Sequence, residues 1–332
     1  MFKNLLNCWA SQPINALLLC AFALLPCSNS AIAQTPETAT IQAGSKRILF
    51  LGDSITHAGG YVASIETALR VQAPSEHPTI LNLGLPSETV SGLSEPGHAG
   101  GAFPRPDLHE RLTRILDLVK PDLVVACYGM NCGMYYPLSE DRFAKFKAGM
   151  EKLHQAVEKR GVQIIHLTPA YFDALPIRDR LLPEGLDEYR QPFAKYDDVL
   201  EAYSTWLIAQ RERGWVVLDV HGAMKSAVAK RRTEDPNFTF AGDGVHPDAA
   251  GQAIIASPLA SYWGLKLDTN GLPTHPKAKE IFQKVSEKQN LLKLSWLTAT
   301  KHIRPGIPEG QPLEQASAQA KLLDEQIDAL LK

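Results

Sequence analysis

Residues 46–56 read KRILFLGDSIT, and this stretch decides the fold class. The apolar run 48–51 ends abruptly at Gly-Asp-Ser, and apolar residues at helical spacing follow over 61–71. An apolar run that stops at turn residues predicts a buried strand, and the break at glycine places Ser54 at the carboxyl end of that strand. A serine delivered to the edge of a sheet in this way is a candidate nucleophile.

Strands and helices alternate along the rest of the chain. Further apolar runs predict strands over 79–83, 123–127, 162–167 and 215–220. Amphipathic patterns predict helices over 61–71, 108–119, 140–159 and 249–263. This alternation is typical of a parallel sheet covered on both faces. We therefore expect an α/β protein with a flavodoxin-like three-layer α/β/α sandwich and a five-stranded parallel sheet.

The chain divides into four segments. Residues 1–33 are interpreted as a secretory signal peptide, because an apolar run over 14–25 is followed by Ala31-Ile32-Ala33, a small-x-small cleavage pattern. An uncleaved anchor and a lipoprotein signal ending at Cys27 are the alternatives. The remaining segments are a polar linker over 34–45, the α/β domain over 46–264 and a C-terminal helical extension over 265–332. The signal predicts a periplasmic or extracellular protein without stable membrane insertion after cleavage.

Composition excludes several classes of protein. The net charge of −2 over 332 residues gives no indication of a nucleic-acid partner. Cys127 and Cys132 are the cysteines that lie beyond the signal, and either a bridge or free thiols would fit them. The sequence contains no metal-ligand cluster, phosphate loop or dinucleotide fingerprint, so neither a cofactor nor a metal is expected.

Two long segments interrupt the alternation. Residues 87–106 are rich in Gly, Pro, Ser and His, and residues 170–192 mix apolar residues with charged ones. Long irregular loops inside a compact domain are usually lids or binding loops, with a disordered surface loop as the alternative.

Four candidate groups follow the predicted strands, at the edge where doubly wound sheets bind ligands. Ser54 is the nucleophile, His246 its general base and Asp243 the group that orients the imidazole. The oxyanion of the tetrahedral intermediate needs hydrogen-bond donors. The backbone N–H of Ser54, one from the 84–87 loop and the amide of Asn131 are suited to that role. Taken singly, each group is as well explained by a turn or a helix cap.

The combination resembles the SGNH hydrolases of the GDSL-type esterase superfamily. Gly52-Asp53-Ser54-Ile55-Thr56 matches the first sequence block of that family, Gly129-x-Asn131 the third and Asp243-x-x-His246 the last. The resemblance covers roughly residues 46–264 and not the tail. It implies the same fold and a serine esterase activity.

Two positions depart from the family pattern. Ser87 stands where family members often carry the oxyanion glycine, so either Gly84 or Ser87 supplies the second backbone donor. Cys132 stands where an aspartate usually follows the asparagine. Residues near these blocks are candidates for contact with substrate, with a structural role as the alternative: Asp53, His57, Tyr61 and His98, and, for a sugar-binding rim, Tyr61, Arg105, Tyr135 and Tyr136.

We expect an exported serine esterase that hydrolyses short acyl esters through an acyl-enzyme on Ser54. Export and a polar site loop favour a small-molecule or polysaccharide substrate that carries O-acetyl groups. A lipase or lysophospholipase-like esterase is the alternative if the pocket is long and apolar. A non-catalytic glycan-binding module on the same scaffold is a further alternative. The intact Ser, Asn, Asp and His argue against it.

Overall fold

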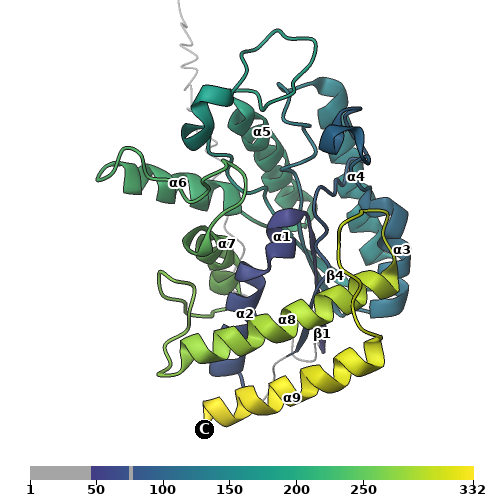
Figure 1. The fold of residues 1–332 in the computed structure, drawn as a ribbon, viewed down its shortest axis with the longest axis vertical. Coiled ribbons are helices and arrows are strands. Elements are labelled where there is room, and N and C mark those ends of the chain that lie inside the picture. Colours follow the sequence, from purple (N-terminus) through teal and green to yellow (C-terminus); the bar gives the residue numbers. More distant parts are fainter. Residues whose placement is uncertain (1–45, 75–77) are drawn as a thin grey trace, which may run out of the picture. The chain divides into compact units, whose positions relative to one another are not determined.

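The computed structural model describes residues 46–74 and 78–332 (Figure 1). In this part of the chain one sheet has the order β2-β1-β3-β4-β5, and every neighbouring pair is parallel. Its strands are β1 Arg47–Gly52, β2 Thr79–Asn82, β3 Leu123–Cys127, β4 Gln163–Leu167 and β5 Val216–Leu218. This order is the flavodoxin-like one, so the predicted sheet is confirmed. The predicted signal peptide and linker lie outside the described residues.

Helices cover both faces of the sheet. Helices α2 and α7 pack together on one side, and α3 and α4 pack together on the other (Figure 1). The helices of this α/β part are α1 Ser54–Ala58, α2 Gly60–Gln72, α3 Leu108–Val119, α4 Glu140–Glu158, α5 Tyr196–Ala209, α6 Val220–Arg232 and α7 Ala249–Tyr262. Short 3₁₀ turns occur at His98–Gly101, Leu175–Arg180 and Gln210–Arg213. The three-layer arrangement is therefore as the sequence predicts.

The hydrophobic pattern explains why the elements form where they do. Every residue of β3 is buried, as expected for the middle strand of a parallel sheet. Helix α3 begins after Asp107, whose carboxylate accepts a hydrogen bond from the N–H of His109, and ends at Lys120 in the left-handed conformation. Its apolar face is buried against the sheet, through Leu108, Leu112, Ile115, Leu116 and Val119.

The C-terminal extension forms α8 (Ala278–Thr300) and α9 (Leu313–Leu331). Helix α8 contacts α2, α3 and the edge strand β2, and α9 packs on α8. The side-chain amide of Gln289 donates to the carbonyl oxygen of Ile80 at 2.9 Å, so α8 supplies a polar partner to the open edge of β2. No helix in residues 46–74 and 78–332 has the length and hydropathy needed to cross a bilayer.

Candidate active site

Ser54, His246 and Asp243 form a hydrogen-bonded chain at the carboxyl end of β1. Nε2 of His246 lies 2.8 Å from Oγ of Ser54, and Nδ1 lies 2.7 Å from Oδ2 of Asp243. A carboxylate only accepts hydrogen bonds, so Nδ1 carries the ring proton and Nε2 is free to accept the serine hydroxyl. The arrangement has the geometry of a nucleophile, a general base and the group that orients the base.

A tight turn holds Asp243 and His246 in this relation. Oδ1 of Asp243 accepts the backbone N–H groups of Val245 and His246 at 2.9 and 2.8 Å. Gly244, which lies between Asp243 and Val245, has a φ of 82°. This left-handed conformation is strained for a residue that carries a side chain. Partial burial raises the pKa of the Asp243 carboxyl, but the hydrogen bonds from His246 and Val245 outweigh burial and hold that pKa below its usual range. Asp243 is therefore ionised at neutral pH.

Asp53 caps the short helix that begins at the nucleophile. Its side chain accepts the N–H of Ile55 at 3.0 Å and is 3% exposed. Burial is the largest influence on this carboxyl and raises its pKa to about 6. The buried carboxylate thus has a structural role as a helix cap, which is the alternative that the sequence left open beside substrate contact. Ser54 is the first residue of α1, and the N–H of a first helical residue has no acceptor within its own helix.

The side chain of Asn82 decides whether Gly84 or Ser87 supplies the second backbone N–H to the oxyanion. The N–H of Gly84 donates to Oδ1 of Asn82 at 2.9 Å and is thus already engaged. Gly84 serves close packing instead, because a Cβ there would lie 2.5 Å from the backbone nitrogen of His57. Ser87 has a φ of 67°, and no acceptor within residues 46–74 and 78–332 takes its N–H. Of the two predicted donors, Ser87 is the one with an N–H to offer.

Asn131 follows β3 and is 4% exposed. Its Nδ2 donates one of two amide hydrogens to the carbonyl oxygen of Glu88, 3.3 Å away. The second amide hydrogen is not used by this contact. Its Oδ1 accepts Nη1 of Arg105 at 2.8 Å. The amide therefore has one hydrogen to give to an oxyanion beside Ser54.

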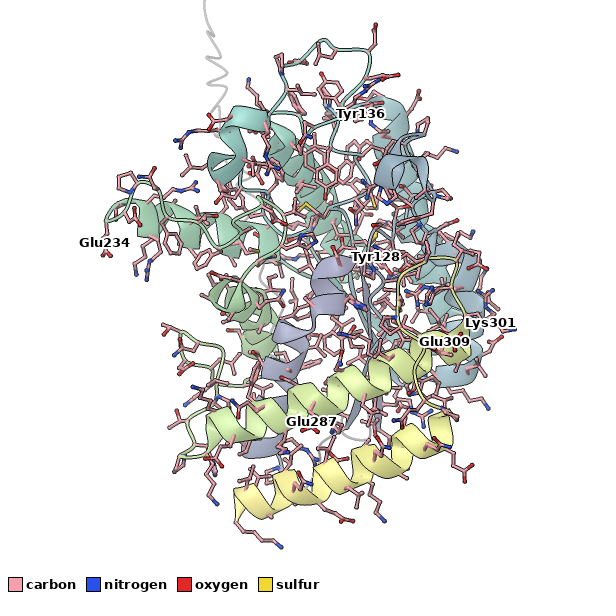
Figure 2. The ribbon with its side chains drawn as sticks, viewed as in Figure 1. Tyr128, Tyr136, Glu234, Glu287, Lys301 and Glu309 are labelled. Atoms are coloured by element: carbon pink, nitrogen blue, oxygen red, sulfur yellow. The ribbon has the colours of Figure 1, made fainter. Side chains whose placement is uncertain are left out.

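A buried ion pair supports the loop that carries Ser87, and sequence reasoning missed it. Glu88 is fully buried and accepts Nε and Nη2 of Arg111 at 2.6 and 2.8 Å and the hydroxyl of Tyr128 at 2.6 Å. Burial raises the pKa of Glu88, although Arg111 and Tyr128 oppose that shift. Figure 2 labels Tyr128. The sequence feature that could have indicated this ion pair is Arg111, which lies on the apolar face of the predicted helix over 108–119.

A large cleft adjoins this site. Its volume is about 1130 Å³, and it is lined by parts of both irregular loops together with Val245, the neighbour of His246. The loops supply residues 95–101 and Arg105 on one side and residues 187–192 on the other. Tyr136, at the upper end of Figure 2, lines the cleft with its ring 4.9 Å from that of Tyr189.

The residues predicted to contact substrate separate into two groups. His98, Arg105, Tyr135 and Tyr136 line the cleft. Tyr61 does not, because it is fully buried, with its hydroxyl 2.9 Å from Oγ1 of Thr56. Its assignment to substrate contact and to the sugar-binding rim is therefore wrong. The ring of His57 is partly buried and donates from Nδ1 to the carbonyl oxygen of Gly84 at 2.9 Å, and burial lowers its pKa to about 4.

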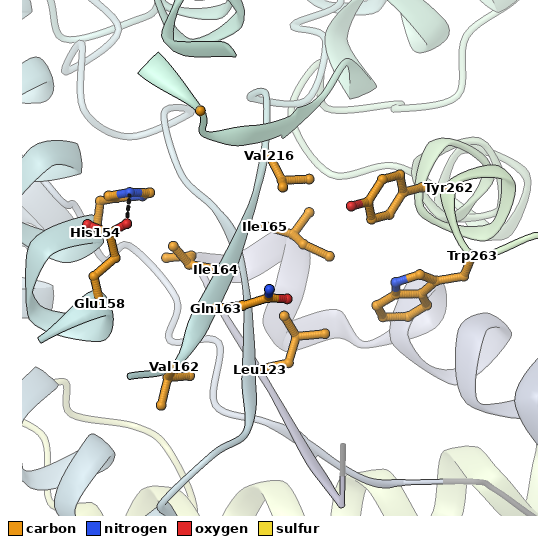
Figure 3. A pocket seen from close by; sticks show the side chains of 11 residues that line it. Leu123, His154, Glu158, Val162, Gln163, Ile164, Ile165, Val216, Tyr262 and Trp263 are labelled. Atoms are coloured by element: carbon orange, nitrogen blue, oxygen red, sulfur yellow. Dashed lines mark ion pairs between the residues drawn. The ribbon is translucent and has the colours of Figure 1, made fainter. Parts of the chain in front are cut away.

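A second cavity of about 420 Å³ lies at the opposite edge of the sheet (Figure 3). It is lined by the amino ends of β3, β4 and β5, by Tyr262 and Trp263, and by His154, which pairs with Glu158 at 3.1 Å. Parallel sheets bind ligands at their carboxyl ends, so this cavity is not the active site. Within the described part of the chain, no group of three or more His, Cys, Asp or Glu is placed to hold a metal ion.

Comparison with known proteins agrees with this geometry. Residues 50–254 match the GDSL-like Lipase/Acylhydrolase family, and the chain belongs to that family. It is thus an ester-hydrolysing enzyme. No curated protein matches the chain.

Similar solved structures show the same fold. One is a gut microbial diltiazem-metabolizing enzyme, with 19% identity and a TM-score of 0.50 over 70% of this chain and 49% of that one. The present chain thus spans about half the length of that enzyme. Another is a catalytic mutant of an acetylxylan esterase from Geobacillus stearothermophilus, with 20% identity and a TM-score of 0.50 over 69% and 98% of the two chains.

Proposed function

We propose that the protein is an exported serine esterase that removes short acyl groups, chiefly O-acetyl groups of carbohydrates, through an acyl-enzyme on Ser54. The observation that carries this proposal is the hydrogen-bonded chain from Ser54 through His246 to Asp243. The proposal assigns each of these residues, and the donors around them, one role in the reaction.

Acylation begins at the serine hydroxyl. Oγ of Ser54 attacks the acyl carbon while Nε2 of His246 takes the hydroxyl proton. The ionised carboxylate of Asp243 stabilises the imidazolium that forms. The tetrahedral intermediate collapses when the imidazolium returns that proton to the alkoxide leaving group, and the alcohol departs. The acyl group remains on Ser54 as an ester.

The negative charge of the intermediate is met by preorganised donors. The N–H groups of Ser54 and Ser87 and the remaining amide hydrogen of Asn131 fill this role. Each such donor is typically worth about 10²- to 10³-fold in rate, since it is aligned before charge develops.

Water completes the cycle. Nε2 of His246 removes a proton from a water molecule, and the resulting hydroxide attacks the acyl carbon on Ser54. The second tetrahedral intermediate releases the carboxylic acid, and the serine oxygen recovers its proton from the imidazolium. No redox step or external cofactor enters this sequence.

The lining of the cleft supports a carbohydrate substrate. Its volume of about 1130 Å³ exceeds that of a usual small-molecule pocket, roughly 300–1000 Å³, as a chain of sugar units requires. Tyrosines present a flat apolar ring beside a polar hydroxyl, which suits the faces of sugar rings. Tyr135 and Tyr136 are half-buried and line the cleft. The acetylxylan esterase named among the similar structures lends this reading further support.

The wall that residues 187–191 contribute to the cleft argues against long acyl chains. A bound chain gains about 0.8 kcal/mol for each buried methylene and so needs an extended apolar wall. The 170–192 loop lines the cleft with polar and charged residues at 187–191, whereas Phe172 from the same loop is fully buried beneath the surface. We therefore rank the lipase or lysophospholipase-like alternative second.

Export is proposed from residues 14–33, which combine an apolar run with the Ala31-Ile32-Ala33 pattern. Mass spectrometry of the protein produced in a secreting host is expected to show a chain that begins at Gln34. An intact Met1, or a lipid on Cys27, would contradict simple cleavage.

The substrate class is tested with purified mature protein on p-nitrophenyl esters of graded chain length and on acetylated and deacetylated xylan. We expect the highest kcat/KM for acetate, with release of acetic acid from the acetylated polymer. Ser54→Ala is expected to abolish hydrolysis with an unchanged unfolding curve. Higher kcat/KM for eight-carbon esters would favour the lipase-like alternative. Turnover by the Ser54→Ala variant would contradict the assignment of the protein as a serine esterase.

A further inference from the structure

A side-chain amide helps an oxyanion only if its nitrogen faces the site. Oxygen and nitrogen of a carboxamide are nearly equal in size, so packing alone does not choose between the two orientations of Asn131. In the flipped orientation Oδ1 would face the developing negative charge and repel it. Something in the structure must therefore select one orientation.

Arg105 is the group that selects it. A guanidinium has donors and no acceptor, and its Nη1 lies 2.8 Å from Oδ1 of Asn131. Flipping the amide would turn its NH₂ against this cation and its oxygen against the carbonyl oxygen of Glu88, 3.3 Å from Nδ2. Both contacts become repulsive in the flipped form. The hydroxyl of Tyr135, 3.4 Å from Oδ1, adds a second and weaker donor on the same side.

Arg105 is itself held rigidly. Its Nε and Nη2 each lie 2.7 Å from an oxygen of Glu95, in the two-pronged geometry that an arginine and a carboxylate form best. Its backbone N–H donates to Oγ of Ser94 at 2.8 Å, and the residue is 8% exposed. Glu95 therefore fixes the plane of the guanidinium, which leaves Nη1 directed at the amide.

The neighbour of Asn131 offers no competing charge. Cys132 is fully buried, and burial raises the pKa of its thiol to about 11, so it is neutral at the pH of an assay. The charged group that contacts the amide thus comes from the 87–106 loop and not from the segment that carries Asn131.

We propose that Arg105 is a positioning residue for ester hydrolysis, which, clamped by Glu95, holds the amide of Asn131 with its N–H toward the oxyanion. This inference rests on the proposed function, in which Asn131 stabilises the intermediate. Arg105 acts through Asn131, so its contribution should disappear when the amide is removed. The effect should fall on kcat rather than KM, because the oxyanion exists in the transition state and not in bound substrate.

The test is a double-mutant cycle in the full mature chain, with p-nitrophenyl acetate as substrate. Asn131→Ala is expected to lower kcat about 100-fold, and Arg105→Met about 10- to 100-fold, both with KM nearly unchanged. In the Asn131→Ala background, Arg105→Met should lower kcat less than about threefold further. Arg160→Met is the matched control, because Arg160 pairs with Asp117 at 2.7 Å and neither lines the cleft nor contacts Asn131. Its kcat should stay at the wild-type value.

Two conservative variants keep the test valid if Arg105→Met does not fold. Arg105→Lys retains the charge but, as a single ammonium, does not hold Glu95 and Asn131 together, so kcat should fall between wild type and Arg105→Met. Glu95→Gln loosens the clamp and should lower kcat several-fold, again without further loss in the Asn131→Ala background. Thermal unfolding of each variant identifies loss of fold.

The outcomes separate the inference from the proposed function. Equal losses from Arg105→Met in both backgrounds, or a rise in KM alone, would overturn the positioning role. Wild-type kcat in Arg105→Met beside a slow Asn131→Ala would overturn it while leaving the esterase mechanism standing. Wild-type kcat in Asn131→Ala would overturn both the inference and the proposed oxyanion role, and turnover by Ser54→Ala would overturn the mechanism itself.

Discussion

Replacing Asp53 by asparagine should stabilise the protein at neutral pH and do little in acid. The carboxyl is 3% exposed, and burial raises its pKa from 3.8 to about 6. Each pKa unit corresponds to about 1.4 kcal/mol, so the native state carries a cost of about 3 kcal/mol when Asp53 is ionised. Asparagine keeps an oxygen to accept the N–H of Ile55, and it caps helices as well as aspartate does.

The sign follows from proton linkage. A carboxyl whose pKa is higher in the folded state binds its proton more tightly there, so ionisation favours unfolding. The cost is absent below pH 3.8, grows between pH 3.8 and about 6, and is complete above. The stability gained by Asp53→Asn should therefore rise through this window and level off near 3 kcal/mol.

Urea denaturation of the wild type and Asp53→Asn at pH 4.5 and 7.5 measures this difference. Asp107→Asn is the matched control, because Asp107 also caps a helix, accepting the N–H of His109 at 2.9 Å, but is partly exposed. This control measures the loss of a capping carboxylate as such, and its change in stability is subtracted from that of Asp53→Asn at each pH. An Asp53→Asn variant that is equally or less stable at pH 7.5, or whose gain does not depend on pH, would refute the reasoning.

Three further predictions concern the site and the tail. His246→Ala should lower kcat at least about 10-fold more than Asp243→Ala, because the carboxylate only orients the base; equal losses in steady-state kinetics would contradict this order. Ser87→Gly should keep kcat within about threefold and not lower the Tm, because the N–H remains and glycine suits a φ of 67°; a large loss of kcat would mean that the hydroxyl acts. Deleting residues 278–332 should abolish cooperative unfolding in calorimetry, because α8 packs on β2 and α2; a retained transition would show that the remainder folds alone.

The sequence was sufficient for the sheet and for the groups at its carboxyl edge. Each strand is a short apolar run bounded by turn residues, and the order of such runs with helices between them restricts the topology. Ser54, Asp243 and His246 each adjoin such an element, so their meeting at one edge was predictable. Helices α1, α5 and α6 were not predicted. The five residues of α1 are too few to display a helical period.

The errors concern side chains whose surroundings come from distant parts of the chain. Tyr61 is buried because α2 is covered by α7 and α8 as well as by the sheet, and nothing near position 61 shows that a tail will pack there. The choice between Gly84 and Ser87 depends on where the amide of Asn82 points. Arg105 was assigned to a sugar-binding rim; it lines the cleft, but its guanidinium is committed to Glu95 and Asn131.

The position of α8 also constrains how the protein is made. A ribosome delivers β2 roughly 200 residues before Gln289, the side chain that donates to the carbonyl oxygen of Ile80. Through that interval the nascent sheet has an unprotected strand at its margin, and such margins pair readily with other chains. We expect translation pauses or stop codons upstream of residue 289 to leave products that aggregate, and a chaperone that shields strand edges to raise the yield of full-length enzyme.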